Sequence, residues 1–579
     1  MTLRALGGTA TSRTLVLLDG VPMADPFFGY IPLSAIAPER LAGARVTRGG
    51  GAGAFGSGAV AGTIELSSAN AHQLGMFAGN AAINNRAETE FSATLAPKLG
   101  DGFAVIGGRW DRGKGFWTTP ESQRVPASVR ASFDSWSVGL RAVALLAPDI
   151  ELQARGLAFE DNRTLRFQGA DTGSSGQDAS LRIVGRGAWQ FDVLGYIQAR
   201  DFNNIVISST SFRKTLDQRN TPSTGAGGKI EVRPPVGGGH LMRIGADMRV
   251  ADGDGYETAY NAGTGAVTAQ RRAGGRNSDF AVFIEDDWNL GPLLLTAGGR
   301  ADRWSIKDGS LTSTNAAATV VTKTVYPDRS GWTGSFRGGA VLKAIKGIEL
   351  RGAIYTGLRQ PTLNELYRSF TVFPVVTRAN AALKNERLFG FEAGADITPL
   401  PGVMFSVTAY DNKIKDAIAN VTIGVNLRER QNVDAVRARG LEFGSSVKAG
   451  QFSFDGSLVL ADAKVEASGA AVGLDGKRPA QTPKVAVSGS VSWHPADGWT
   501  LSGTVRHVSA QFEDDLEKDS LKAATTISAF AQIPLSDSFS IILRGENLTN
   551  TEVITRNQAG SIDLGTPRTL WAGVRVRLR

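Results

Sequence analysis

The chain lacks cysteine entirely and has only four histidines among its 579 residues. The absence of cysteine excludes disulfides, thiolate metal sites and a cysteine nucleophile. The histidines have no serine and aspartate neighbours that would suggest a catalytic triad; they are His72, His240, His494 and His507. We therefore predict that the chain is not an enzyme and that it carries no metal or cofactor.

Long hydrophobic runs and a strong charge of one sign are missing as well. The mean hydropathy is −0.10, and no run of about 18 apolar residues occurs, which excludes a helical membrane protein but not a membrane β-barrel. The net charge of +8 is modest for this length and is not gathered in one tail. Nucleic-acid binding, which favours a basic stripe with aromatic residues, is not predicted.

What the sequence has instead is strict alternation, most clearly at its C-terminal end. Apolar residues alternate with polar or small ones from Leu570 to Leu578, and Arg575, Arg577 and Arg579 share the polar side. Successive side chains of a strand point to opposite faces. A soluble sandwich strand would show this pattern too, but the pattern recurs through most of the chain with no helices to cover a sheet. A closed transmembrane barrel with a wet lumen is therefore predicted.

The spacing of turn residues predicts the size of this barrel. Short Pro-, Gly- and Asp-containing connections alternate with long polar segments. The short ones lie at 97–102, 147–149, 191–192, 234–240, 289–292, 345–347, 398–402, 449–451, 495–498 and 535–538. About ten turns and eleven loops predict about 22 antiparallel strands of roughly ten residues each. Six tryptophans near the inferred strand ends favour interfacial girdles over a soluble core; they are Trp110, Trp136, Trp189, Trp288, Trp332 and Trp493.

The opening residues differ from this repeating pattern. A buried-looking strand at 14–18 is followed by the turn Asp19-Gly20, and a glycine-rich stretch covers 49–62. A phosphate-binding loop is not predicted there, because no Lys-Ser/Thr pair follows the glycines and no helix begins. We predict a small α+β domain at residues 1–70 and the barrel at residues 71–579.

Several motifs together resemble one family, the TonB-dependent outer-membrane receptors. They occur in the family's order over nearly the whole chain. They are LVLLDGVP (15–22), IAPER (36–40), VTRG (46–49), FGSGAVAGTI (55–64), GLRQPTLNELY (357–367), LKNE (383–386), FEAG (391–394), VRARGLE (436–442), ENLTNT (546–551) and PRTL (567–570). The first four resemble the C-terminal half of the family's plug domain.

The resemblance implies a plug lodged inside a barrel in the outer membrane of a Gram-negative bacterium. It implies uptake of a large nutrient chelate, such as a ferric siderophore or cobalamin, driven by the TonB–ExbB–ExbD complex. The expected surroundings are outer-membrane lipid and lipopolysaccharide, with the protein a monomer. A passive porin-like channel is the alternative function, and the plug motifs speak against it.

In this family two plug arginines face two barrel glutamates and latch the plug. By motif, the plug partners here are Arg4 and Arg48, and the barrel partners are Glu392 and Glu442. Glu386 competes with Glu392 for the first position. Arginine–carboxylate pairs suit a latch because they are strong and directional yet reversible. The same charges would otherwise be ordinary lumen residues in contact with water.

The substrate is less well indicated. No histidine lies between the segments 358–361 and 380–383, where haem receptors of the family carry one. Arg271, Arg272 and Arg276 are interpreted as a loop that either steers an anionic chelate or is simply solvated. The repeat at 252–255, Asp-Gly-Asp-Gly, indicates either a calcium site or, more often, a turn.

The resemblance begins in the middle of a plug. We expect earlier plug strands, a TonB box and a signal peptide to precede Met1, with either a misassigned or trimmed start or a truncated gene as the reason. A non-functional truncated receptor is thus a further alternative. The family usually ends its last strand with an aromatic residue, and this sequence ends with Arg579.

Overall fold

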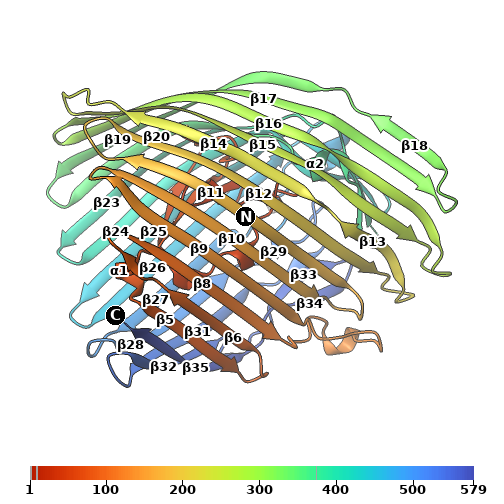
Figure 1. Ribbon diagram of the computed structural model, residues 1–579. Coiled ribbons are helices and arrows are strands. Elements are labelled where there is room, and N and C mark those ends of the chain that lie inside the picture. The colour runs from red at the N-terminus through yellow and green to blue at the C-terminus, as the bar shows by residue number, and fades with distance from the viewer. Residues whose placement is uncertain (1–2, 8–10, 52, 373–374, 579) are drawn as a thin grey trace.

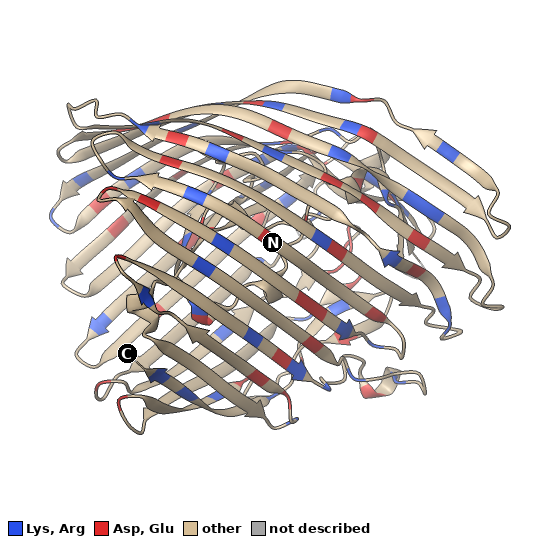
Figure 2. Cartoon of the chain, viewed as in Figure 1, with Lys and Arg blue, Asp and Glu red and all other residues tan. Residues whose placement is uncertain are grey.

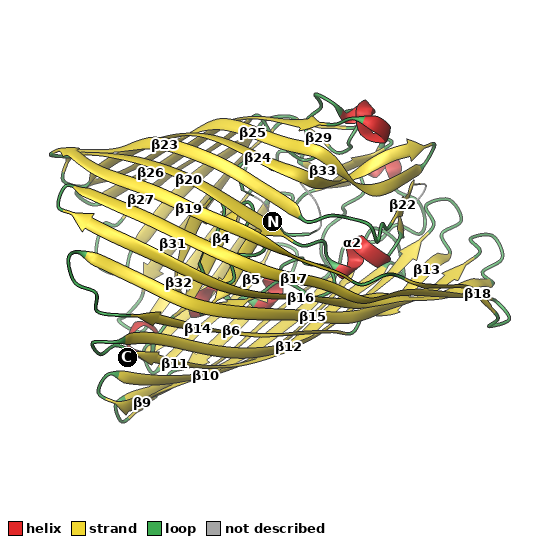
Figure 3. Ribbon diagram, turned by 90° about the horizontal axis from the view of Figure 1, so that it is seen from above, coloured by secondary structure: helices red, strands yellow, loops and turns green. Residues whose placement is uncertain are grey.

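The computed structural model describes residues 3–7, 11–51, 53–372 and 375–578, so that Met1 and Arg579 lie outside the described residues. About 66% of the chain is in strands. Within the described residues, no helix is long and apolar enough to cross a membrane. The helical segments are short (Figure 3, red). They are η1 (Leu33–Ala35), η2 (Pro38–Arg40), α1 (Ala71–Leu74), η3 (Glu121–Gln123), α2 (Leu363–Tyr367) and η4 (Gly469–Leu474).

Twenty-two strands, each antiparallel to its neighbours, form a closed barrel wall, as predicted (Figure 1). The ring closes where β35 pairs with β5. The wall strands are β5 (Phe77–Asn84), β6 (Thr89–Leu95), β8 (Gly102–Gly113), β9 (Phe133–Ala147), β10 (Ile150–Thr164), β11 (Asp171–Gly185), β12 (Gln190–Ile207), β14 (Ser223–Arg233), β15 (His240–Tyr260), β16 (Val267–Leu290), β17 (Leu293–Asn315), β19 (Arg329–Ile345), β20 (Ile348–Arg359), β23 (Glu386–Leu400), β24 (Val403–Gly424), β25 (Leu427–Ala449), β26 (Phe452–Glu466), β27 (Val485–Trp493), β28 (Thr500–Val508), β31 (Ala524–Pro534), β32 (Phe539–Glu546) and β35 (Thr569–Leu578).

Shorter strands extend the wall or form hairpins in its connections. They are β7 (Lys98–Leu99), β13 (Lys214–Asn220), β18 (Val320–Val325), β21 (Phe370–Val372), β22 (Val375–Arg378), β29 (Gln511–Phe512), β30 (Ser520–Leu521), β33 (Ile554–Gln558) and β34 (Ser561–Leu564). Because short and long connections alternate along an antiparallel wall, the short turns share one end, the turn end. The long connections share the other, the loop end, where β13 and β18 project (Figure 1, right).

Two sequence predictions about the wall were wrong in detail. Most wall strands are longer than ten residues; β16 alone has 24. Hairpins such as β15–β16 continue beyond the alternating segment because cross-strand backbone hydrogen bonds need no apolar face, so the polar sequence was mistaken for loop. The turn predicted at 191–192 lies at 186–189, since β12 begins at Gln190.

The predicted faces of the strands are as expected. Leu570, Val574 and Leu578 are exposed on the outside, while Trp571 is buried in the lumen. The six tryptophans singled out above are also exposed. Three lie towards the loop end (Trp110, Trp136 and Trp332) and three towards the turn end (Trp189, Trp288 and Trp493), as expected for two interfacial girdles.

The opening segment forms a four-stranded sheet inside the ring (Figure 1, red). Its strands are β1 (Thr14–Leu18), β2 (Val21–Pro22), β3 (Leu41–Arg48) and β4 (Gly62–Ser68), in the order β2-β1-β4-β3. β1 and β4 are parallel, and the other pairs are antiparallel. The sheet packs against the wall, where Val16 and Leu18 join Leu157 and Phe159 in one buried cluster.

The glycine-rich stretch brings the backbone of this segment against the wall. Gly49 has a φ of +86°, and a Cβ there would collide with the ring of Tyr355. A Cβ on Gly50 would collide with the Thr356 carbonyl oxygen. Glycine is therefore required at this close approach of two backbones.

Candidate functional site: the contacts between plug and barrel

Arg4 belongs to the opening segment inside the ring, which we call the inner segment. It bridges this segment to the wall strands β23 and β25. Its Nη1 lies 2.5 Å from Glu392 Oε2 and donates to the Tyr355 hydroxyl at 2.7 Å, and its Nη2 lies 3.2 Å from Glu442 Oε2. The guanidinium also lies 4.5 Å from the ring centroid of Tyr410. Burial lowers the pKa of Arg4, but Tyr355 and the two carboxylates outweigh burial and hold it above its ordinary value. The group therefore stays charged.

Arg48 has a weaker contact with the same glutamate. Its Nε lies 3.5 Å from Glu442 Oε1, and half of its side chain is exposed. Arg4 thus contacts both expected glutamates, Glu392 and Glu442, and Arg48 contacts the second of them. We call these four residues the Arg4 latch.

Glu386 is not part of the Arg4 latch. It is fully buried and forms ion pairs with Arg13, at 2.6 Å, and with Arg359. The backbone N–H of Ile418 donates to it at 2.8 Å. Sequence reasoning missed Arg13 and Arg359. A signal for Arg359 was present, because the nearby residues 362–365 form a capping box that begins α2 and positions a carboxylate for it.

That carboxylate belongs to Glu365, which lies 3.0 Å from Arg359 Nη1. Burial raises the pKa of Glu365, but the Arg359 guanidinium outweighs burial and holds it below its usual value. The chain Arg13–Glu386–Arg359–Glu365 therefore links the inner segment through the wall to the loop-end helix α2.

A further contact uses the backbone of the inner segment. Asp247 accepts from the Phe55 N–H at 3.0 Å, and Arg300 donates to the Gly53 carbonyl at 3.1 Å. Asp247 and Arg300 are themselves paired at 2.5 Å. The Gly58 N–H donates to the Leu358 carbonyl at 2.6 Å. Sequence reasoning missed this contact, since backbone partners leave no pattern in the sequence.

The arginines interpreted as a steering loop lie in strand β16. Arg272 pairs with Asp254 at 2.7 Å and Arg276 with Asp252 at 2.8 Å, while Arg271 lies 4.0 Å from Glu257. The repeat at 252–255 belongs to β15, so the turn interpretation was wrong; cross-strand ion pairs keep it extended. Within the described part of the chain, no cluster of His, Cys, Asp or Glu is suited to a metal ion.

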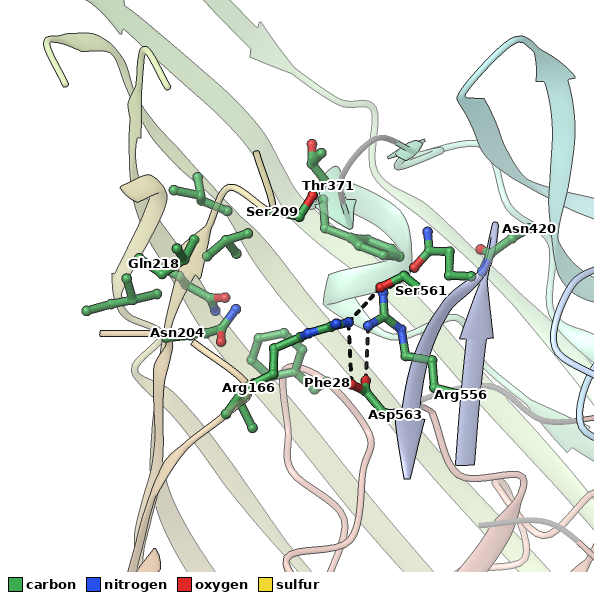
Figure 4. A pocket seen from close by; sticks show the side chains of 18 of the residues that line it. Phe28, Arg166, Asn204, Ser209, Gln218, Thr371, Asn420, Arg556, Ser561 and Asp563 are labelled. Atoms are coloured by element: carbon green, nitrogen blue, oxygen red, sulfur yellow. Dashed lines mark hydrogen bonds and ion pairs between the residues drawn. The ribbon is translucent and has the colours of Figure 1, made fainter. Parts of the chain in front are cut away.

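A cavity of about 890 Å³ opens at the loop end above the inner segment, and we call it the loop-side chamber (Figure 4). Phe28 of the inner segment forms part of its lining. Thr11 of the same segment also lines it, and the other lining residues come from the ends of wall strands and from the loop-end connections, including α2, β33 and β34. Its charged lining residues are Arg166, Arg368, Arg430, Arg556, Glu365 and Asp563.

A second cavity, of about 620 Å³, lies on the turn side between the inner sheet and the wall. Its lining mixes both signs of charge, for example Arg182 and Lys229 around Asp192. Both signs are also interspersed along the wall strands (Figure 2). The lumen on this side is thus polar and carries both signs of charge, as expected for a hydrated interior.

Two family models match the chain. The model described as TonB-dependent receptor plug domain matches residues 1–63, and the model described as TonB dependent receptor-like, beta-barrel matches residues 101–548. No curated protein matches the chain.

Solved structures of similar fold cover nearly the whole chain. The FrpB iron transporter from Neisseria meningitidis is 15% identical with a TM-score of 0.77, over 100% of this chain and 93% of its own. The ferric yersiniabactin uptake receptor FyuA from Yersinia pestis is 13% identical with a TM-score of 0.79, over 100% and 91%. The copper transporter OprC is 16% identical with a TM-score of 0.79, over 100% and 93%. At such identity these likenesses show the fold, whereas the barrel model spans more than half of the chain, and the protein therefore belongs to the TonB-dependent receptor family.

Proposed function

We propose that this protein is an outer-membrane transporter that takes up a large nutrient chelate, with TonB supplying the energy. The observation that carries the proposal is the opening segment lodged inside a closed wall and held there by the Arg4 latch. A passive pore needs no such segment. The iron, ferric yersiniabactin and copper carriers of the same fold support an iron- or other metal-bearing cargo.

The family and fold indicate the outer membrane of Gram-negative bacteria, and receptors of this family take up small-molecule chelates and work with TonB. For this chain we propose the TonB–ExbB–ExbD complex as energy source, outer-membrane lipid and lipopolysaccharide as surroundings, and a monomeric state. We further propose that residues 1–70 move as the plug and residues 71–579 stay fixed as the barrel.

In this proposal the chelate first occupies the loop-side chamber, which is sealed below by the plug. Force on the plug then breaks the contacts of the Arg4 latch. Charge-assisted hydrogen bonds suit this step because each is strong in the closed state, yet polar groups and water in the lumen can replace it.

Uptake of chelates carrying radiolabelled iron tests this proposal. Cells in which the receptor is the only route for the chelate should accumulate label, and loss of TonB or collapse of the proton-motive force should abolish accumulation while surface binding remains. Accumulation that continues without TonB would favour the passive channel and contradict the proposal.

A further inference from the structure

Two arginines from different loop-end connections share one carboxylate in the loop-side chamber. Arg166 Nη1 lies 3.4 Å from Asp563 Oδ1 and donates to Ser561 Oγ at 2.6 Å, while Arg556 Nη1 lies 3.1 Å from Asp563 Oδ2. Figure 4 shows these side chains meeting within the chamber. Two guanidinium groups thus face a single negative charge.

The positive charge at this point is only partly compensated. Burial lowers the pKa of Arg166 and Arg556 lowers it further, with Asp563 opposing both. The Nε of Arg166 is buried and has no hydrogen-bond partner in the part of the chain that the structure describes. Asp563 and Arg556 keep 21% and 28% of their side chains exposed, so a ligand in the chamber reaches them.

The rest of the chamber lining also has more positive than negative side chains. The whole lining contains four arginines and two carboxylates. Arg368 is paired at 2.6 Å with Glu257, which lies outside the lining, and Glu365 is bound by Arg359, so that Arg166, Arg556 and Arg430 face Asp563 alone. Among the described residues, the side chain of Arg430 donates only to backbone carbonyl oxygens, those of Asn364 and Arg368. An anion is therefore the ligand that completes the charge balance of the chamber.

The lining also limits what kind of anion fits. Its residues include Phe28, Phe167, Phe202 and Phe370 but no histidine, cysteine or methionine, the side chains that hold a soft metal ion directly. A volume of about 890 Å³ suits an organic molecule, since pockets for such ligands span about 300–1,000 Å³. A bare soft metal ion would find neither suitable ligands nor fit.

We infer that the loop-side chamber binds an organic anion whose carboxylate or catecholate oxygens contact Arg166 and Arg556 and whose apolar body lies against the phenylalanines. This inference rests on the proposed function and narrows its cargo to negatively charged chelates. Asp563 contacts the same two guanidinium groups that the anion would contact, so it competes with the ligand.

The test compares three variants of the full chain in detergent, with ferric chelates of different charge as probes. The probes are an anionic tricatecholate complex, an anionic polycarboxylate complex, a neutral trihydroxamate complex and cobalamin. Arg166→Gln and Arg556→Gln should weaken binding of at least one anionic complex about tenfold or more. Asp563→Asn should strengthen binding of the same complex. Added salt should weaken it in the unaltered protein.

Arg163→Gln is the matched control, because Arg163 lies near the end of β10, close to Arg166 in the sequence. Its side chain is 51% exposed and pairs with Asp161, and neither residue lines the chamber. It should leave binding unchanged. Preference for the neutral complex or cobalamin, binding of no anionic complex, or a weaker anion affinity in Asp563→Asn would overturn the inference. TonB-dependent uptake of a neutral chelate would contradict the inference but leave the proposed function intact. Binding of an anionic chelate without energised uptake would support the inference but contradict the proposed function.

Discussion

The outer and inner faces of the barrel wall depend on different interactions. On β27, Val487 points outward and is 40% exposed, while the neighbouring Ser488 faces the lumen. The outer face is repetitive, and any apolar residue there satisfies a lipid environment. The inner face is specific, since Glu386 has defined partners far away in the sequence, at Arg13 and Arg359. The outer face therefore places the protein in a membrane, and the inner face decides what the protein does there.

The largest expected effect comes from breaking the inner face at its most buried charge. Glu386→Ala leaves Arg13 and Arg359 without their shared carboxylate, at a cost of about 3–5 kcal/mol. The free energy of unfolding in detergent, from a denaturant titration, measures it. Glu466→Ala is the control, because Glu466 is 40% exposed and pairs with Lys413 near the surface. Equal effects of both substitutions would show that the inner contacts are not specific.

The next largest effect is expected from placing arginine on the outer face and on the inner face of the wall. Arginine at Val487 or Val574 should reduce the amount of assembled barrel, since an arginine facing lipid costs about 2–4 kcal/mol near the membrane centre. Arginine at Ser488 faces water in the lumen and should be tolerated. The heat-modifiable, folded fraction on a gel reports assembly. If Ser488→Arg assembles as poorly as Val487→Arg, the assignment of faces is wrong.

The Arg4 latch is expected to give a smaller effect. Glu442→Ala removes one of the two carboxylates of Arg4 and leaves Glu392 in place, a loss of about 1–3 kcal/mol. The plug should loosen, and cells should become more sensitive to antibiotics too large for porins. Asp462→Ala, at a side chain 59% exposed, is the control. Unchanged permeability in Glu442→Ala would show that this glutamate does not latch the plug.

The smallest effect concerns pH within the plug. Burial raises the pKa of Asp25 from 3.8 to about 6, although the N–H groups of Phe28 and Phe27 oppose the rise. The folded plug therefore binds this proton more tightly than the unfolded chain, so its stabilising effect is complete below about pH 4 and is lost as the pH rises through about 6. Asp25→Asn should remove this dependence, because an amide oxygen still accepts from both N–H groups. Protease resistance of the plug at pH 4 and pH 7 measures it, and an unaltered pH dependence in the variant would count against Asp25.

Much of the fold was predictable because the wall repeats a local rule. Alternation at 570–578 and the turn spacing predict strands, faces and strand number without any knowledge of distant contacts. The motif residues Arg4, Glu392 and Glu442 were predictable only through family resemblance. Arg13 and Arg300 were not, because their partners are Glu386, Asp247 and a backbone carbonyl, which closure of the barrel brings to them.

The length of the wall strands and the presence of the chamber could also not be predicted from local sequence patterns. The hairpin of β15 and β16 continues into a stretch rich in glycine and charged residues, so the alternation fades although the backbone pairing persists. Arg166 and Arg556 are far apart in the sequence and meet only because β35 closes the ring onto β5. A local sequence pattern predicts the strand in which a residue lies, whereas the chamber forms only when the whole ring has closed.

Cross-linking between plug and wall tests the central claim most directly. The rings of Phe28 in the plug and Phe202 on β12 have centroids 4.9 Å apart, and the chain has no cysteine of its own. The pair Phe28→Cys and Phe202→Cys should be joined by a short thiol-to-thiol reagent into a single product of altered gel mobility. The pair Phe28→Cys and Phe452→Cys, with Phe452 exposed on the outer face, should not be joined. Failure of the first pair to react, or equal reaction of both, would show that the opening segment does not lie in the bore.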